Sequence, residues 1–539
     1  MSERLALLGD EAVALGALHG GISAAYGYPG TPSTEILQYL INNFKKTDGA
    51  PVARWCSNEK TAMEAAMGVS FAGRRAIVTM KHVGLNVAAD PFINSALLKI
   101  KGGLVIAVAD DPGMHSSQNE QDSRFYADFA LVPCLEPRSQ QEAYDMAREA
   151  FEVSERFNVP VVLRLVTRLA HARAAVVPKQ GKNQNKLSKT QEKNSWMLLP
   201  AFARKNYNAL LDKQNVLAEW SYQHPANKMN SAKSDLAIIT SGLGGNYYEE
   251  NLNDFIELRK KQGKSIPSHL HIGAYPLPEK KIRKLCDEAE EIIIIEEGQP
   301  FIAKKIFGLT GAELKPVIRA GELDPDNVRK ILGLPSRKTI KSKIDADRLP
   351  PRPPVLCQGC PHTDSYNTIN KAVAFLDSRP GHPDVGINSD IGCYSLGATP
   401  PLSAIETIIC MGACVGMAKG ASDAGLKYSL AVIGDSTFIH SGITPLIDAV
   451  EADVPMTLII LDNSSVAMTG CQPTIVPSDK LKSLILGCGV KPERLLELEA
   501  RPNLVEDNAA KLKIEIEHKG LSVVVFKREC LEAIRKNKK

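Results

Sequence analysis

GDSTFIHSGITPLIDAVEADVPMTLIILDNSSVAMTG, residues 434–470, joins two short apolar segments through a stretch with helical periodicity. The first segment, 430–433, runs into Asp435, and the second, 456–461, runs into Asn463. Four apolar residues between them recur at helical spacing: Ile443, Leu446, Ile447 and Val450. The pattern predicts a strand, a helix and a second strand. If the strands are parallel neighbours, both turns reach the same edge of the sheet, where α/β proteins hold ligands.

The two turns carry oxygen ligands. The carboxylate of Asp435 and the carboxamide oxygen of Asn463 suit Mg²⁺, which uses few protein groups when a diphosphate supplies the others. Asn463 follows Asp435 by 28 positions (463 − 435), and this spacing resembles the thiamine-diphosphate motif, a Gly-Asp turn followed later by Asn. The usual third residue of that turn, Gly, is replaced by Ser436. Taken alone, the stretch also fits an ordinary βαβ crossover in a doubly wound sheet.

Length and composition indicate a multidomain globular protein. The 539 residues are too many for one core and predict about three or four domains. Hydrophobic residues make up 44% and charged residues 23%, as in globular proteins that fold in water. A net charge of +4 favours no particular partner, and no arginine-rich stripe with interleaved aromatic residues predicts nucleic-acid binding.

The sequence predicts a cytoplasmic protein without a membrane segment. Charged residues in the first 16 positions interrupt any signal-peptide core, and no segment approaches roughly 18 uninterrupted apolar residues. The eleven cysteines of such a chain are expected to be thiols or metal ligands rather than a disulfide framework.

The order of apolar segments divides the chain. Strands are expected at 76–80, 104–109 and 160–165 in a first α/β domain, and at 236–240 and 291–297 in a smaller one. A lysine-rich, apolar-poor stretch at 173–195 predicts a solvated linker. The predicted parts are 1–172, a basic linker and connecting segment at 173–231, a smaller domain at 232–345, and a last domain at 346–539.

Glu59 begins a helical segment, 59–68, that is rich in small residues. Thiamine chemistry needs one carboxylate beside a nitrogen of the aminopyrimidine ring, where it assists proton removal from the reactive carbon. Glu59 suits this role. The alternative is a solvated glutamate that is stabilised by the dipole at the start of its helix.

The last domain contains four cysteines that we expect to meet. Cys357 and Cys360 form a CxxC pair, Cys393 lies in the segment 389–397, and Cys530 follows the predicted strand 521–526. Four thiolates at strand and loop ends suit a [4Fe–4S] cluster or a structural zinc ion. The alternative for Cys393 and Cys530 is that each is a small core residue.

Several blocks together resemble the thiamine-dependent 2-oxoacid:ferredoxin oxidoreductases, in the branch of the indolepyruvate ferredoxin oxidoreductase α subunits. The blocks are YPGTPSTE (28–35), NEKTAMEAAMG (58–68), TMKHVGLNVAADP (79–91), DDPGMHSSQNEQDSR (110–124), CQGCPH (357–362), DIGCYSLG (390–397), ICMGACVGMAKG (409–420) and the GDS and LDN turns. The resemblance implies an α/β fold with several doubly wound parallel-sheet domains: a pyrimidine-binding domain at 1–172, a transketolase C-terminal-like domain at 232–345 and a diphosphate-binding domain at 346–539.

The resemblance also implies residue roles. Glu59 would contact the aminopyrimidine, and Asp435, Asn463 and the Ser465 carbonyl would hold Mg²⁺. Thr31 lies in the loop that faces the 2-oxoacid. The implied iron–sulfur ligands are Cys357, Cys360, Cys393 and Cys530, which favours a [4Fe–4S] cluster over zinc. The other candidates are His82, His115 and Arg124 for binding or proton transfer, and His362, Gly434 and Ser436 for cofactor binding.

The activity that this resemblance implies is oxidative decarboxylation of a 2-oxoacid, such as indolepyruvate, to an acyl-coenzyme A and CO2. Electrons would pass through one [4Fe–4S] cluster to ferredoxin, and a β subunit would complete an α2β2 heterotetramer. A two-cluster ferredoxin domain usually follows in this branch, whereas this sequence ends nine residues after Cys530. Two alternatives stay open: a non-oxidative thiamine-dependent decarboxylase, and a non-catalytic iron–sulfur or zinc scaffold subunit.

Overall fold

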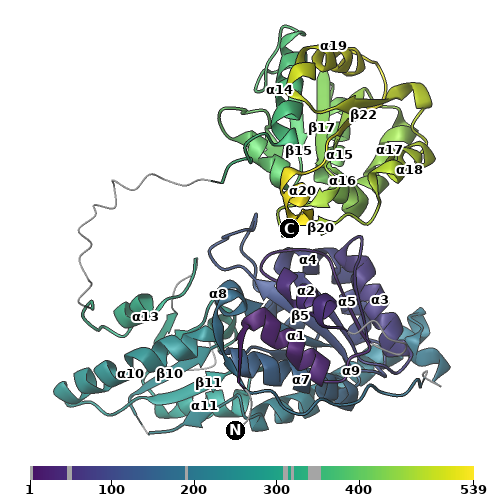
Figure 1. Cartoon of the computed structure of the whole chain (residues 1–539). Coiled ribbons are helices and arrows are strands. Elements are labelled where there is room, and N and C mark those ends of the chain that lie inside the picture. The colour runs from purple at the N-terminus through teal and green to yellow at the C-terminus, as the bar shows by residue number, and fades with distance from the viewer. Residues whose placement is uncertain are drawn as a thin grey trace. The chain divides into compact units, whose positions relative to one another are not determined.

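The computed structural model describes residues 4–44, 51–188, 192–232, 234–306, 313–316, 321–337 and 354–538. The chain forms two compact units, Met1–Lys341 and Ser342–Lys539, which are described separately (Figure 1). The predicted boundary at 345/346 lies outside the described residues.

A mainly parallel sheet forms the centre of the first unit, in the order β12-β6-β7-β5-β4-β2-β3. Its strands are β2 (Ala24–Gly27), β3 (Val52–Trp55), β4 (Ala76–Lys81), β5 (Leu104–Asp110), β6 (Cys134–Leu135), β7 (Val161–Val166) and β12 (Ala274–Tyr275). Every pair is parallel except β12 with β6. β4, β5 and β7 are fully or almost fully buried, as their continuous apolar sequences predict.

Helices of the first unit cover this sheet, and α1 packs along α7 (Figure 1). Their bounds are α1 (Gly9–His19), α2 (Thr34–Asn43), α3 (Glu59–Phe71), α4 (His82–Val87), α5 (Ala89–Ala96), α6 (Arg124–Phe129), α7 (Gln140–Phe157) and α8 (Thr167–His171). The chain repeatedly alternates strand and helix, so the carboxyl ends of the parallel strands lead into the loops that hold most of the predicted site residues.

A second, smaller sheet belongs to the same unit, in the order β14-β13-β10-β11-β9. Its strands are β9 (Met229–Asn230), β10 (Leu236–Ser241), β11 (Ser268–Ile272), β13 (Glu291–Ile295) and β14 (Glu313–Pro316), and its helices are α10 (Leu243–Lys261), α11 (Glu279–Glu288), α12 (Phe301–Ile306) and α13 (Pro325–Ile331). Ile293 and Ile295 pack in a cluster with α10 and α13, whereas Ile292 and Ile294 pack in the cluster that contains α11 and α12. Because β12 lies in the larger sheet, the described strands and helices of the smaller sheet belong to the same compact unit, Met1–Lys341, as the larger one.

The segment 173–188 differs from the predicted solvated linker. β8 (Arg173–Val176) pairs antiparallel with β1 (Leu5–Leu8), and the backbone that follows bonds to the first domain: Lys182 N donates to His19 O (2.9 Å) and Ser188 N to Ala72 O (2.9 Å). The Lys179 ammonium pairs with Asp145 at 2.6 Å. Lys182 likewise pairs with Glu152, so two of these lysines contact acidic side chains of α7. Further along the chain lies α9 (Pro200–Gln223).

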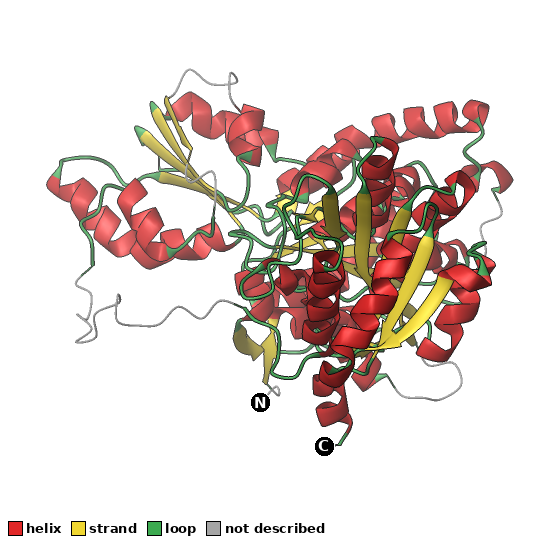
Figure 2. Ribbon diagram, turned by 90° about the horizontal axis from the view of Figure 1, so that it is seen from above, coloured by secondary structure: helices red, strands yellow, loops and turns green. Residues whose placement is uncertain are grey.

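The second unit is a doubly wound parallel sheet, in the order β16-β15-β17-β18-β22-β21 (Figures 1 and 2). Its strands are β15 (Val385–Ser389), β16 (Thr407–Ile408), β17 (Tyr428–Gly434), β18 (Met456–Asp462), β21 (Leu495–Glu499) and β22 (Ser522–Lys527), with a short hairpin of β19 (Ser465–Val466) and β20 (Gln472–Pro473). Its helices are α14 (Pro361–Ala374), α15 (Ala413–Asp423), α16 (Asp435–Thr437), α17 (Ile443–Ala452), α18 (Ser478–Gly487), α19 (Val505–Ile516) and α20 (Leu531–Asn537).

Two apolar clusters cover the faces of this sheet. One contains α14 and α19, and the other contains α15, α17 and α18. The chain leaves β15 towards β16 and returns to β17 on the other side of β15, so the strand order reverses between β15 and β17. Ligands in open α/β sheets bind at such a reversal, beside the carboxyl ends of the strands.

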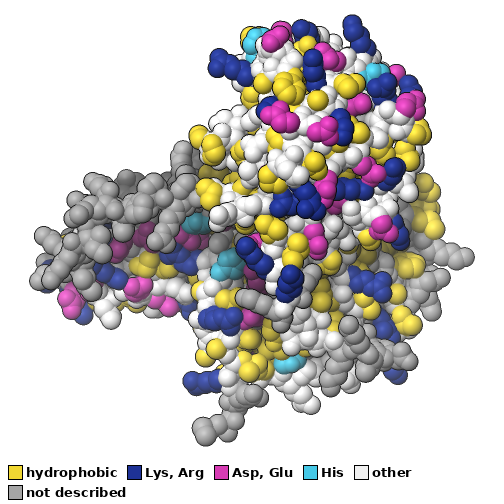
Figure 3. All heavy atoms as spheres, turned by 45° about the horizontal axis from the view of Figure 1, so that its top comes forward, with side chains coloured by type: hydrophobic (Ala, Val, Ile, Leu, Met, Phe, Trp, Pro, Cys, Tyr) yellow, Lys and Arg dark blue, Asp and Glu magenta, His cyan; other side chains and the backbone are white. Residues whose placement is uncertain are grey.

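No helix in the described part of the chain is both long and apolar enough to cross a membrane. On the face shown in Figure 3, basic and acidic side chains are intermixed, in keeping with the small net charge.

Candidate active site

The turns after β17 and β18 meet, as the sequence predicts. Gly434 pairs with Leu461 in the parallel register, which puts Asp435 beside the second turn. Asp435 Oδ2 accepts a hydrogen bond from Ser464 N (2.9 Å), and its Oδ1 accepts one from Ser436 N (2.7 Å). Because Ser464 separates Asn463 from Ser465, this bond holds the three predicted Mg²⁺ ligand residues at one corner of the sheet.

Asp435 needs a positive partner. Its side chain is buried, and burial, followed by the nearby Asp462 carboxylate, raises the pKa of Asp435 well above its usual range. Among the described residues no lysine, arginine or histidine forms an ion pair with it. A buried carboxylate next to a second one is costly unless a proton or a cation compensates the charge. The donor set therefore fits Mg²⁺, which prefers carboxylate and carbonyl oxygens.

His362 fixes the orientation of the Asn463 carboxamide. Burial lowers the pKa of His362 to about 4, so its ring is neutral near pH 7. Asn463 Nδ2 then donates to the Nε2 atom of His362 at 3.2 Å, while Asn463 Oδ1 accepts from Ser465 N at 3.2 Å. His362 thus acts through Asn463 and leaves the carboxamide oxygen on the side of the turn where a metal ion would bind.

Gly434 is required by close packing at the end of β17. A Cβ atom there would lie 2.6 Å from the ring of Tyr394. Tyr394 comes from the loop after β15 and donates from its hydroxyl to Ile391 O (3.0 Å). Asp390 in the same loop is buried and accepts from Gly412 N (2.9 Å) and Cys414 N (3.2 Å) at the start of α15. The two strands on either side of the order reversal thus both end in buried aspartates, Asp390 and Asp435.

The four predicted cluster ligands line one cavity of about 100 Å³, together with His362 and Asn463. Cys360 caps α14, Cys393 begins a 3₁₀ turn and Cys530 caps α20. Thiolates are favoured at helix N-termini. Burial, followed by the neighbouring thiols, raises the pKa of Cys393 to about 12. Bound iron would remove this penalty because it ligates the thiolate form.

A direct contact links the cysteines to the predicted Mg²⁺ turn. The backbone N–H of Cys530 donates to the carbonyl of Asn463 at 3.0 Å. The residue that would hold the cluster and the residue that would hold the metal ion are thus adjacent.

Glu59 lies in the first unit, at the start of α3. Asn58 caps this helix by accepting from Thr61 N at 2.9 Å. The Glu59 side chain is only 4% exposed, which contradicts the alternative of a solvated helix-start residue. Gly84 in α4 packs against it, since a Cβ on Gly84 would lie 2.5 Å from Glu59 Oε1. The carboxylate is therefore held against α4 at the carboxyl end of β4.

The loop that contains Thr31 lies over the same edge of the sheet. Ser116 Oγ donates to Thr31 O at 3.1 Å, and a Cβ on Gly30 would contact the Lys81 side chain at 3.2 Å. His82 is 1% exposed, and its Nε2 lies 3.1 Å from Asn119 O. Thr31 and His82 therefore lie near the carboxyl ends of β2 and β4.

Two other predicted residues lie elsewhere in the unit. The side chain of His115 is 53% exposed and its Nε2 is 3.5 Å from Glu322. Arg124 is fully buried in an ion-pair network between the two sheets: it pairs with Asp122 (2.5 Å) and Glu296 (3.1 Å) and donates to Glu297 O (3.1 Å). A buried guanidinium requires such partners, so its geometry indicates a structural role rather than the predicted binding or proton transfer.

Two family models match the chain. Residues 15–238 match the thiamine-diphosphate-binding family of pyruvate flavodoxin/ferredoxin oxidoreductase, and residues 390–526 match the C-terminal thiamine-pyrophosphate-binding domain of thiamine-pyrophosphate enzymes. The indolepyruvate oxidoreductase subunit IorA of Archaeoglobus fulgidus is 36% identical over 98% of this chain and 86% of its own length. The chain belongs to the IorA family.

Other members of the IorA family have a similar sequence identity and cover the same share of this chain. Those of Methanothermobacter marburgensis and Pyrococcus horikoshii are each 34% identical over 98% of this chain, covering 87% and 86% of their own lengths. The predicted assignment to thiamine-diphosphate-dependent 2-oxoacid:ferredoxin oxidoreductase α subunits is therefore confirmed.

A solved structure shares the fold. The 2-oxoglutarate:ferredoxin oxidoreductase from Magnetococcus marinus, solved with 2-oxoglutarate, coenzyme A and succinyl-CoA, aligns with a TM-score of 0.51 and 16% identity, over 61% of this chain and 66% of its own. This likeness confirms the predicted fold class of this IorA-family chain.

Sequence reasoning missed Lys81 and the proximity of Cys471 to Cys530. Burial lowers the pKa of Lys81 to about 8, while the nearby Asp111 and Glu59 carboxylates partly offset this effect. Lys81 Nζ donates to Ser116 O at 3.0 Å. Burial, followed by the nearby Cys530 thiol, raises the pKa of Cys471 above its usual range. The only sequence signal for Lys81 is its place directly after a buried strand, and Cys471 has none.

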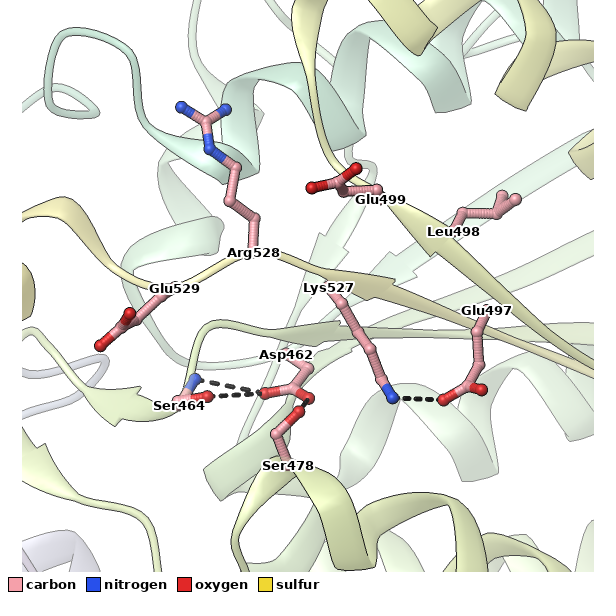
Figure 4. Close-up of a pocket in the computed structure, with 9 residues that line it drawn as sticks. All are labelled: Asp462, Ser464, Ser478, Glu497, Leu498, Glu499, Lys527, Arg528 and Glu529. Carbon is pink, nitrogen blue, oxygen red and sulfur yellow. Dashed lines mark hydrogen bonds and ion pairs between the residues drawn. The ribbon is translucent and has the colours of Figure 1, made fainter.

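Asp462 was also missed, and it lines a neighbouring pocket of about 450 Å³ (Figure 4). Its carboxylate accepts from Ser464 N (3.2 Å) and from the Ser478 hydroxyl. Across this pocket the Lys527 ammonium pairs with Glu497. Asp462 is thus held in place by hydrogen-bond donors, and its charge acts on Asp435.

Proposed function

We propose that this chain is the catalytic subunit of an enzyme that oxidatively decarboxylates an arylpyruvate, with indolepyruvate as the expected substrate. The products are the acyl-coenzyme A and CO2. Two electrons leave one at a time through a single [4Fe–4S] cluster to ferredoxin, and one proton is released. The substrate class rests on the names of the IorA relatives.

The contact between Cys530 and Asn463 supports this proposal most directly. Residues suited to the cluster and to Mg²⁺ share one hydrogen bond, so electrons from the reaction centre would have a short path to iron. A non-oxidative decarboxylase has no need of four thiols at this place, and a scaffold subunit has no need of the buried Asp435 and Glu59.

Each residue has a proposed task. Asp435, Asn463 and the Ser465 carbonyl bind Mg²⁺ and through it the diphosphate of thiamine diphosphate, while His362 orients Asn463. Thiamine diphosphate supplies the carbon nucleophile and the electron sink when bound. Glu59 holds a proton at the aminopyrimidine nitrogen. The cluster is held by four thiolates, those of Cys357, Cys360, Cys393 and Cys530. Thr31 and His82 face the substrate.

A partner chain is part of the proposal. The IorA relatives are named as subunits, and we propose a β subunit in an α2β2 heterotetramer, since closed two-fold assemblies are favoured. Full activity of this polypeptide alone would contradict the need for that partner.

The test is viologen reduction by the holoenzyme, purified without oxygen from its native source. Activity should require a 2-oxoacid and coenzyme A, and kcat/KM should be higher for indolepyruvate than for pyruvate. A higher value for pyruvate would overturn the substrate assignment. CO2 release without viologen reduction would overturn the oxidative reaction in favour of the non-oxidative decarboxylase.

A further inference from the structure

A group of ligand-type side chains lies in the first unit, apart from the residues assigned above. Asp10 is in the first turn of α1, Glu35 in the first turn of α2, and His171 ends α8. One ligand atom from each residue lies within 4.8 Å of those of the other two. His171 Nε2 is 3.5 Å from Glu35 Oε2. Three chain segments that are far apart in sequence thus bring two carboxylates and an imidazole together.

Asp10 gives an independent indication of a ligand. Its side chain is fully buried, and neither carboxylate oxygen has a hydrogen-bond donor among the described residues. Burial, followed by the acidic neighbours Glu35 and Glu11, raises the pKa of Asp10 well above its usual range, and the basic neighbour in the group, His171, lies against Glu35. The nearby Arg173 is paired with Glu11. A buried carboxylate in this position needs a proton or a metal ion.

We propose that Asp10, Glu35 and His171 bind a divalent transition-metal cation of the Zn²⁺ and Mn²⁺ class. Two carboxylates and one imidazole are ligands of such ions, whereas Mg²⁺ and Ca²⁺ favour oxygen alone. The side chains of Glu35 and His171 are 40% and 36% exposed, so the ion can enter from solvent and these two side chains can close onto it. Asp10, which is fully buried, then supplies the ligand on the inner side of the site.

The site has a structural consequence for the Thr31 loop. Thr34, which precedes Glu35, accepts from Gly30 N at 3.0 Å, and Ser33 Oγ donates to Gly30 O at 2.8 Å. A cation at Glu35 therefore fixes the start of α2 against α1 and α8, directly below the loop. This inference does not rest on the proposed reaction.

Mn²⁺ titration of the purified full-length chain tests the site, with free Mn²⁺ measured by EPR. Mn²⁺ suits this test because it favours oxygen and imidazole over thiolate, so the cysteines do not compete. Glu35→Gln and His171→Gln should each bind about one Mn²⁺ fewer per chain than wild type, and EDTA should lower the Tm of wild type by more than it lowers the Tm of either variant. Glu11→Gln, on the same helix as Asp10, is the matched control and should behave as wild type. Asp435→Asn identifies any Mn²⁺ that binds at the other metal site.

Equal Mn²⁺ stoichiometry and an equal EDTA response in wild type, Glu35→Gln and His171→Gln would overturn the proposal. Asp10 and Glu35 would then share a proton instead of a metal ion. His171→Gln changes a partly exposed residue and is expected to fold, so the test does not depend on the variant at Glu35.

Discussion

The backbone N–H of Cys530 donates a 3.0 Å hydrogen bond to the carbonyl of Asn463. Asn463 directly follows β18, and Cys530 caps α20 after the neighbouring strand β22. Because β18 and β22 are parallel and adjacent, their carboxyl ends reach the same edge of the sheet. This register is the reason that a thiol from the last residues of the chain reaches the predicted Mg²⁺ turn.

Substitution of Cys530 and substitution of Cys471 should have different effects on the iron content of the protein. Cys530→Ser should lose most of the iron, about four atoms per chain in wild type, because it lines the cavity with Cys357, Cys360 and Cys393. Cys471→Ser should keep the iron, since Cys471 does not line that cavity, but it should alter the EPR signal of the reduced cluster. Iron analysis and EPR of protein purified without oxygen measure both. If Cys530→Ser kept all its iron and Cys471→Ser lost it, Cys471 would be the cluster ligand and Cys530 the neighbouring thiol.

Asp435→Ala should abolish binding of thiamine diphosphate in the presence of Mg²⁺, because the metal ion loses its charged ligand while the phosphates stay negative. Asn463→Ala should weaken binding less, since it removes a neutral ligand. Isothermal titration calorimetry measures the affinity of each variant for thiamine diphosphate. The control is Glu497→Gln, because the Glu497 carboxylate pairs with Lys527 in the neighbouring pocket. Unchanged affinity in Asp435→Ala would refute this metal site.

Glu59→Gln should slow exchange of the thiamine C2 proton by about 10²–10⁴-fold, the usual contribution of a general acid–base group. Gly84→Ala should slow it too, because the added Cβ would displace the Glu59 carboxylate. Glu64→Gln is the control, since Glu64 is exposed on the same helix and pairs with Lys60. NMR of C2 exchange in the loaded enzyme makes the measurement, and a wild-type rate in Glu59→Gln would disprove the role of Glu59.

Lys81 should make the stability of the first unit depend on pH. Burial lowers its pKa from 10.5 to about 8, so the unfolded chain binds more protons than the folded one between these values. The stabilising contribution of Lys81 is fully present above pH 10.5 and is lost as the pH falls through 8. The free energy of unfolding of wild type relative to Lys81→Met should therefore drop by at most about 3 kcal/mol from pH 10.5 to pH 8. Denaturant titrations at several pH values measure it, and a constant difference would contradict the shift.

The sequence patterns predicted the main strands and the meeting of the turns after β17 and β18, because buried parallel strands are continuous apolar runs and Asp435 and Asn463 directly follow two of them. They did not show that residues 173–188 lie along the first domain. A lysine-rich sequence predicts a solvated segment, and the acidic partners of the lysines on α7 are not evident from the sequence. The ion-pair network of Arg124 was not visible for a related reason: Asp122 is near it in sequence, but its other acidic partners, Glu136 and Glu296, are distant. Lys81, Asp462 and Cys471 depend on contacts between loops, which periodicity does not encode. The predicted division of residues 1–345 into separate domains stays a prediction.

The most direct test of the account is freeze-quench EPR of the anaerobic holoenzyme mixed with indolepyruvate. The signal of one reduced [4Fe–4S] cluster per chain should appear on mixing and should be absent when thiamine diphosphate has been removed, because the electrons come from the decarboxylated substrate. CO2 release with no reduced-cluster signal would contradict the proposal that the cysteines beside Asn463 carry electrons out of the active site.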